Sequence, residues 1–217
     1  MRIKISVPDT LSDITLGQYQ RFLKIQETEK DQLVLGSKMI EIFCNVPYGN
    51  MIEYRMSHIN RISKKITDIF QEETPNLIRH FKANKIEFGF IPNLDEMTFG
   101  EYVDLDTYFK DWDNMHLAMS VLYRPVIQKY NDRYIIEKYK ADNKIDLKQM
   151  PLDVCFSSIV FFYNLGNDLS KTMLDYLKPQ ERATLLHSQI LEQNGDGINQ
   201  FMHSLKEILQ DTKISLN

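Results

Sequence analysis

Two similar six-residue stretches decide the fold of this 217-residue chain: Ile14-Thr15-Leu16-Gly17-Gln18-Tyr19 and, 83 residues later, Met97-Thr98-Phe99-Gly100-Glu101-Tyr102. Each has the form of a capping box. In this motif a threonine hydroxyl accepts from the backbone N–H three residues on, and the Gln or Glu at that position reaches back to the threonine. The flanking apolar residues are placed to form a hydrophobic staple. We therefore predict that helices begin after Thr15 and Thr98.

The likeness extends upstream of both stretches. Alternating apolar residues predict a short strand before each helix, and Leu94 occupies the place of Leu11. The alternating residues are Ile3, Ile5 and Val7 in the first copy and Ile86, Phe88 and Phe90 in the second. These patterns indicate two strand–turn–helix units, over residues 2–26 and 85–110, whose strands are expected to pair. A chance likeness between two capped helices is the alternative.

The rest of the chain is predicted to be mainly helical. Helices are expected over 33–45, from Ser57 as the cap to Phe70, and from Asp113 as the cap to Leu122, with a hairpin over 126–139. Pro151 is placed to open a long helix, and two further helices are expected over 179–192 and 198–209. The fold class is therefore α+β and predominantly α-helical. Its small sheet combines the two strands of the repeat with the hairpin and is covered by helices.

Two regions are expected on one core: an α+β domain over 1–150 and a helical region over 151–217. The composition, 43% hydrophobic and 26% charged, is that of a globular protein, and a chain of this length can bury about 72% of its surface. Cys44 and Cys155 lie in apolar surroundings and are expected to be buried free thiols. No signal peptide is recognised, and the most apolar stretch, 154–165, is too short for a membrane span.

The net charge of −4 hides two unlike segments. Seven basic against three acidic residues give residues 54–86 a net charge of +4, whereas seven acidic residues against one lysine give residues 93–113 a net charge of −6. Complementary patches orient association, so both segments are candidates for partner binding. The candidate residues are Asp104, Asp106, Asp111, Asp113, Arg61, Lys64 and Lys65.

The last predicted helix supplies three more candidates, Phe201, Leu205 and Ile208. Their helical spacing makes this helix either the final layer of the core or an element offered to a partner.

Catalytic and metal motifs are missing from the sequence. The five histidines form no HExxH arrangement, and neither a GxSxG elbow nor a phosphate-binding glycine loop occurs. Asp104 and Asp106 point about 200° apart on a helix, which disfavours a divalent metal site. No cofactor and no catalytic residue is expected. Two alternatives stay open: an enzyme whose site is built from residues distant in sequence, and a nucleic-acid binder that uses a contiguous basic face over 55–85.

The run from Phe88 to Asp106, together with three later segments, resembles a pattern of tail assembly chaperones and related morphogenesis proteins of tailed bacteriophages. The later segments are Val121 to Val126, Ile136 to Tyr139, and Met150 to Asp153 leading into Phe161 to Gly166. The resemblance covers roughly residues 86–170, with Ile14 to Tyr19 as a weaker extension.

The resemblance implies a non-enzymatic protein that acts through protein–protein contacts during tail or head assembly. Its partners would be other phage structural or assembly proteins, with self-association as a further possibility, and neither nucleic acid nor a membrane is expected as a partner. It would work in the host cytoplasm during assembly, and whether it remains in the virion is left open. Members of this group have no catalytic residues to transfer.

Overall fold

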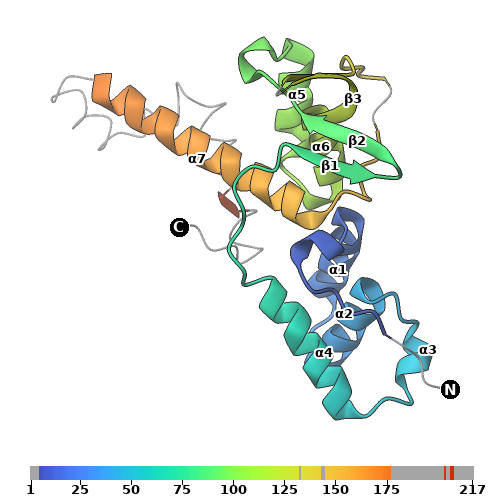
Figure 1. Cartoon of the computed structure of the whole chain (residues 1–217). Helices are drawn as coiled ribbons and strands as arrows, with labels where there is room; N and C mark the ends of the chain where they lie inside the picture. The colour runs from blue at the N-terminus through green and yellow to red at the C-terminus, as the bar shows by residue number, and fades with distance from the viewer. Residues whose placement is uncertain (1–4, 132, 143–144, 177–202, 204–205, 208–217) are drawn as a thin grey trace.

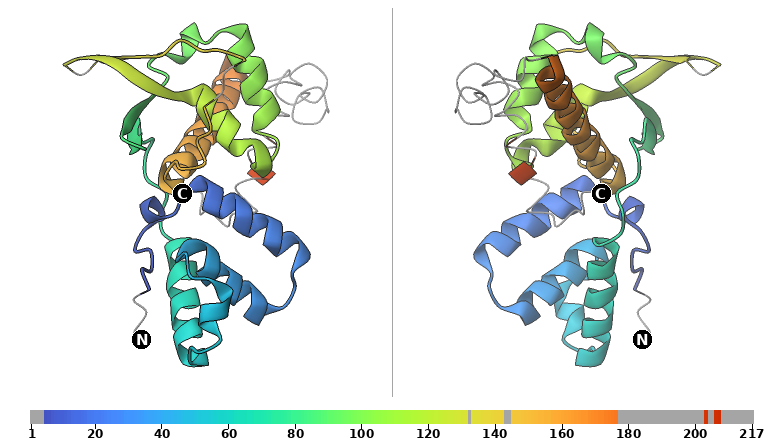
Figure 2. Two further views of the ribbon diagram at one scale, coloured as in Figure 1. Left: turned by 90° about the vertical axis from the view of Figure 1, so that its right-hand side faces the viewer. Right: turned by 90° about the vertical axis from the view of Figure 1, so that its left-hand side faces the viewer.

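A computed structural model describes residues 5–131, 133–142, 145–176, 203 and 206–207. These residues form an elongated α+β structure with a helical lobe at one end and, at the other, a lobe built around a four-stranded antiparallel sheet (Figure 1). The two views of Figure 2 show the same stacking of the lobes. None of the helices within the described residues has both the length and the apolar character needed to cross a bilayer.

The helical lobe contains the first four α-helices. They are α1 (Leu16–Thr28), α2 (Gln32–Phe43), α3 (Tyr48–Met51) and α4 (Met56–Ile69). Helix α2 lies between α1 and α4, and the apolar stripe of α4, including Ile59, Ile66 and Ile69, is buried. The prediction of helices over 33–45 and up to Phe70 is confirmed. Ser57 is not the cap of α4, however, because the N-cap residue is Arg55, which makes no side-chain capping bond.

The sheet lobe contains four strands in the order β1-β2-β3-β4 and three further α-helices. The strands are β1 (His80–Ala83), β2 (Ile86–Phe90), β3 (Tyr123–Tyr130) and β4 (Arg133–Ile136). The helices are α5 (Phe99–Tyr108), α6 (Met115–Leu122) and α7 (Leu152–Tyr176). Three short 3₁₀ turns, η1 (Leu11–Asp13), η2 (Leu94–Glu96) and η3 (Trp112–Asn114), precede α1, α5 and α6. The predicted hairpin is confirmed as β3 and β4, although β4 ends earlier, at Ile136.

The repeated unit is present as a turn and a capped helix. In each copy a 3₁₀ turn is followed by an apolar residue, a threonine N-cap and a complete capping box. Thr15 N–H donates to Gln18 Oε1 at 2.9 Å, and Thr98 N–H donates to Glu101 Oε2 at 2.7 Å. Both predicted helix starts are confirmed. The corresponding leucines, Leu11 and Leu94, each begin the 3₁₀ turn.

The predicted strand of the first unit is wrong over its described part, because residues 5–9 have no regular secondary structure. The second predicted strand is β2, but it pairs with β1 and β3 rather than with the N-terminal segment. Strand β1 was not expected from the sequence. Alternating apolar residues indicate only that a segment can form a strand with one apolar face. They do not identify the strand that pairs with it, which can come from anywhere in the chain.

Helix α7 and the loop before it join the two lobes. Met150 and Lys148 carbonyl oxygens accept from Leu16 N–H at 2.9 Å and Gly17 N–H at 2.8 Å, so this loop caps the start of α1. Farther along, Phe162 of α7 packs against Phe90 of β2. The long helix predicted from Pro151 is confirmed, and Cys44 and Cys155 are buried free thiols as expected. The helices predicted over 179–192 and 198–209 lie almost entirely outside the described residues.

Candidate protein-interaction surfaces

Helix α5 is fixed to the sheet by a buried ion pair. Arg124 Nη1 of β3 lies 2.6 Å from Glu101 Oε1, and the two side chains are only 10% and 5% exposed. The other carboxylate oxygen of Glu101 accepts from the backbone N–H and the hydroxyl of Thr98, each at 2.7 Å. One carboxylate therefore caps the helix and anchors it to the strand.

The ion pair is charged in the folded protein. Burial raises the pKa of the Glu101 carboxyl, but the hydrogen bonds from Thr98 and the Arg124 guanidinium outweigh burial and hold this pKa below its usual value. Gln18 has the corresponding double role in the first unit, since it caps α1 and its Nε2 donates to Ile42 O of α2 at 2.8 Å. The third helical position of each repeat thus ties its helix to a different neighbour.

The outer face of α5 is apolar and exposed. Phe99 is 83% exposed, and Tyr102 and Val103 are about half exposed, at 50% and 42%. These three residues are spaced i, i+3 and i+4, so they share one side of the helix. Asp95 and Glu96 of the preceding turn η2 are also exposed. We call these five residues the α5 surface.

The α5 surface reverses the usual distribution of side chains in a helix. Within the first turn the charged residue, Glu101, faces inward, whereas the large aromatic residue, Phe99, faces solvent. Scattered apolar residues are normal on protein surfaces, but contiguous apolar groups rimmed by charges are typical of interaction sites. None of the candidate residues predicted from the sequence belongs to this surface. The sequence does contain an indication of this surface, because apolar residues occur on both faces of α5 and only one face can pack against the core.

The four acidic candidates each make a contact within the chain. Asp104 accepts from the Tyr139 hydroxyl, and Asp106 pairs with Lys110 Nζ at 2.9 Å. Asp111 caps turn η3 through a bond from Asp113 N–H at 2.9 Å, and Asp113 itself pairs with Lys24 Nζ at 2.8 Å. These four carboxylates therefore mainly stabilise this region of the chain. The exposed apolar side chains beside them are more accessible to a protein partner.

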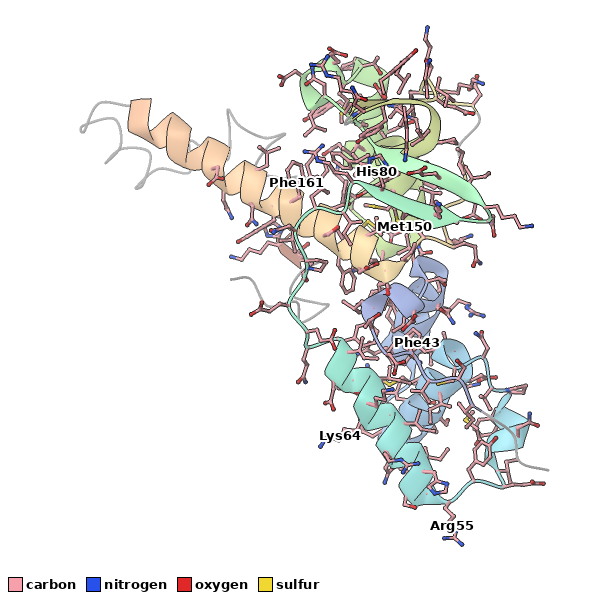
Figure 3. The ribbon with its side chains drawn as sticks, viewed as in Figure 1. Phe43, Arg55, Lys64, His80, Met150 and Phe161 are labelled. Carbon is pink, nitrogen blue, oxygen red and sulfur yellow. The ribbon has the colours of Figure 1, made fainter. Side chains whose placement is uncertain are left out.

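The three basic candidates lie on α4, at the opposite end of the molecule from α5 (Figure 1). Arg61, Lys64 and Lys65 are exposed, and Lys65 forms an ion pair with Asp9. Figure 3 shows Arg55 and Lys64 extending outward from this end. The acidic and basic candidates therefore do not meet within one molecule.

The basic residues of 55–85 do not form one face. Arg55, Arg61 and Lys64 belong to the α4 end, whereas Lys82 and Lys85 belong to the β1–β2 hairpin in the other lobe (Figure 1). The contiguous basic face required by the nucleic-acid alternative is thus interrupted.

A second exposed apolar group lies at the corner between α3 and α4. Ile52 is 76% exposed, and Tyr48 and Met56 are about half exposed. Arg55, the N-cap residue of α4, lies between Ile52 and Met56 in sequence, and Glu53 is an acidic neighbour. Lys64 extends from the side of α4 that faces away from α3 (Figure 3). We call Tyr48, Ile52, Glu53, Arg55 and Met56 the α3–α4 surface.

The candidates Phe201, Leu205 and Ile208 lie outside the described residues, so the structure does not place them.

Two hollows of about 650 Å³ each contain titratable groups. One, beside α5, is lined by the Glu101–Arg124 pair and by Tyr139. The other, beside α1, is lined by His116 and by the Lys24–Asp113 pair. His116 Nδ1 lies 3.2 Å from Gln20 Nε2. These groups thus have partners that account for their positions.

The described residues do not form a recognisable metal-binding site. No group of three or more His, Cys, Asp or Glu residues among them is arranged to hold an ion. The cysteines are poor nucleophiles as well, since burial raises the pKa of the Cys44 thiol to about 11 and that of Cys155 further.

Comparisons with known proteins identify no relative of this chain. No protein-family model, no curated protein and no solved structure matches it. Its role is therefore inferred from its own residues.

Proposed function

We propose that this chain is a non-enzymatic morphogenesis protein of a tailed bacteriophage that works through protein–protein contacts during tail or head assembly. The observation that carries the proposal is the α5 surface, where a firmly anchored helix presents Phe99, Tyr102 and Val103 to solvent. The resemblance of residues 86–170 to phage assembly proteins supplies the biological setting. That resemblance includes Phe99, Tyr102 and both partners of the ion pair that anchors α5.

The anchoring of α5 supports a role in binding. A contact surface on a rigid element loses little conformational freedom on association, which preserves affinity. The Glu101–Arg124 pair and the Thr98 cap fix the inner face of α5, while Phe99, Tyr102 and Val103 on its outer face are exposed to solvent. Burying an aromatic side chain of this kind contributes about 1.5–3 kcal/mol, so a few such residues support a transient assembly contact.

The proposed setting is the host cytoplasm during assembly, with partners among the phage structural and assembly proteins. An assembly chaperone would be found in lysates of phage-producing cells but not in purified particles, whereas a structural component would be found in both. Mass spectrometry of the two fractions separates these roles. Absence of the chain from both fractions would contradict the proposal.

The contact surface is tested by purifying the tagged chain from phage-producing cells and quantifying the proteins that accompany it. We expect particle or assembly proteins of the phage to accompany the wild type and to be depleted at least about tenfold with Phe99→Ser. Ile127→Ser is the matched control, because Ile127 is also well exposed but lies on the β3–β4 hairpin. Equal recovery with both variants would contradict the role of α5.

A further inference from the structure

Strand β4 is an edge strand that borders the hollow beside α5. It is last in the sheet order β1-β2-β3-β4, so only β3 pairs with it among the described strands. The hollow, of about 650 Å³, is lined by every residue from Tyr134 to Tyr139 and also by residues of the segment 91–98. Strand β1, at the other edge of the sheet, does not line it. We propose that this hollow binds an extended polypeptide segment, which adds to β4 as a further strand.

The register of the β3–β4 hairpin shows which backbone groups of β4 point away from β3. Glu137 N–H donates to Pro125 O of β3 at 2.9 Å. In an antiparallel pair, the backbone N–H and C=O groups of successive residues alternate between the two sides of a strand. Since the N–H of Glu137 is directed toward β3, the groups of Ile136 are directed away from it. The same alternation directs the groups of Tyr134 outward.

The outward groups of Tyr134 and Ile136 have no hydrogen-bond partner in the part of the chain that the structure describes. Ile136 is nevertheless only 8% exposed. Buried backbone groups are almost always paired, because an unpaired one costs free energy comparable to a lost hydrogen bond. An added strand would pair them, since its own N–H and C=O groups recur at the same spacing of two residues. The unpaired edge of a sheet is a template for such a strand.

The lining of the hollow favours a polypeptide over a small anion. Arg124, its buried cation, is already bound to Glu101, so its charge does not direct an anion into the hollow. The exposed charged residues of the lining are of both signs: Glu96, Glu137 and Lys138. Ile135, which is 46% exposed, and Met97 add apolar contacts. When a strand is added to a sheet, main-chain bonds supply affinity, and contacts to alternate side chains supply specificity.

The strand site is separate from the contact proposed for α5. Phe99, Tyr102 and Val103 do not line the hollow, although Glu96 belongs both to its lining and to the α5 surface. The β3–β4 hairpin, yellow-green in Figure 2, extends outward from the sheet lobe, so a segment of another protein can approach it. The inference therefore goes beyond the proposed function, and either can fail without the other.

The test uses peptides selected from a random linear library for binding to the folded, full-length chain. Hydrogen exchange followed by NMR then reports on β4. Without peptide, the amides of Tyr134 and Ile136 should exchange fast, whereas those of Ile135 and Glu137, which face β3, should be protected. The bound peptide should slow exchange at Tyr134 and Ile136 at least about tenfold. The amides of β1 should be unchanged.

Two further changes test whether backbone pairing holds the peptide. N-methylation of one alternate set of peptide residues should abolish binding, and methylation of the other set should not, because only one set faces β4. In the protein, Ile135→Lys should weaken binding about tenfold, since it replaces an apolar contact at the edge. Ile127→Lys is the matched control, because Ile127 is 61% exposed on β3 and does not line the hollow. Circular dichroism verifies that both variants fold.

Four results would overturn the inference. They are a selection that yields no peptide, a bound peptide that leaves exchange at Tyr134 and Ile136 unchanged, equal sensitivity to both sets of methyl groups, and amides of Tyr134 and Ile136 that are already protected in the free chain. None of them bears on the proposed function, which is judged by the recovery of phage proteins with Phe99→Ser.

Discussion

At the residue scale, the clearest feature is that the two glycines of the repeat have different environments. A Cβ atom on Gly17 would lie 2.9 Å from Lys148 Cβ and 3.1 Å from Lys148 O, closer than atoms can pack without displacement. A Cβ on Gly100 would meet its nearest neighbour, the Tyr139 ring, at an ordinary 3.8 Å. Glycine is therefore needed in the first unit because the loop at Lys148 docks there.

Alanine at these two positions should have opposite effects on stability. Gly17→Ala should lower the free energy of unfolding by about 1–3 kcal/mol, because it forces the loop at Lys148 away from α1. Gly100→Ala should be neutral or raise this free energy by up to about 1 kcal/mol, since alanine favours the helix. Chemical denaturation measures both. Equal losses of stability would show that the contact with Lys148 is not what requires glycine.

His116 should make the fold sensitive to mild acid. Burial, together with the nearby Lys148 ammonium, lowers the pKa of its imidazole below the usual value of about 6.5. The unfolded chain therefore binds more protons than the folded chain as the pH falls through this range, and stability is lost. We expect the free energy of unfolding to decrease between pH 7.5 and pH 5.5. It should decrease less in His116→Gln, and an unchanged pH dependence in this variant would argue against the role of His116.

At the element scale, local signals in the sequence predicted the helices well, and pairing between distant segments was poorly predicted. The capping boxes at Thr15 and Thr98 use side chains three residues apart, so the sequence contains the whole motif. Strand β1 is different, since its ladder depends on β2, and β2 pairs in turn with β3, more than thirty residues away. The Glu101–Arg124 pair also depends on that distant pairing, because Gly89 of β2 lies opposite Arg124.

Loss of Arg124 should loosen α5 from the sheet. Arg124→Met leaves the buried Glu101 carboxylate without its cation, and removal of one partner of a buried pair costs about 3–5 kcal/mol. Adding Glu101→Gln to this variant should recover much of the loss, since Gln can keep the capping box as Gln18 does in the first unit. A double-mutant cycle by chemical denaturation measures the coupling. No recovery in the double variant would show that Arg124 acts by packing alone.

At the scale of the whole molecule, the charge polarity seen in the sequence becomes a separation in space. The acidic segment begins at the end of the sheet lobe and runs back to α1, where Asp113 pairs with Lys24, whereas the α4 part of the basic segment lies at the end of the helical lobe (Figure 1). The sequence could indicate the opposite charges but not the exposed residues beside them, because the inward or outward direction of Phe99 is set by how Glu101 is anchored. Exposure of Ile52 likewise depends on the corner between α3 and α4.

The central claim is that the α5 surface is a protein contact, and site-specific photo-crosslinking tests it most directly. A photoreactive phenylalanine analogue is placed at position 99 or, as the control, at the exposed position Gln26 of α1, in phage-producing cells. The account predicts a discrete adduct from position 99 that contains a phage assembly or structural protein, and no such adduct from position 26. The same products from both positions, or none from position 99, would contradict it.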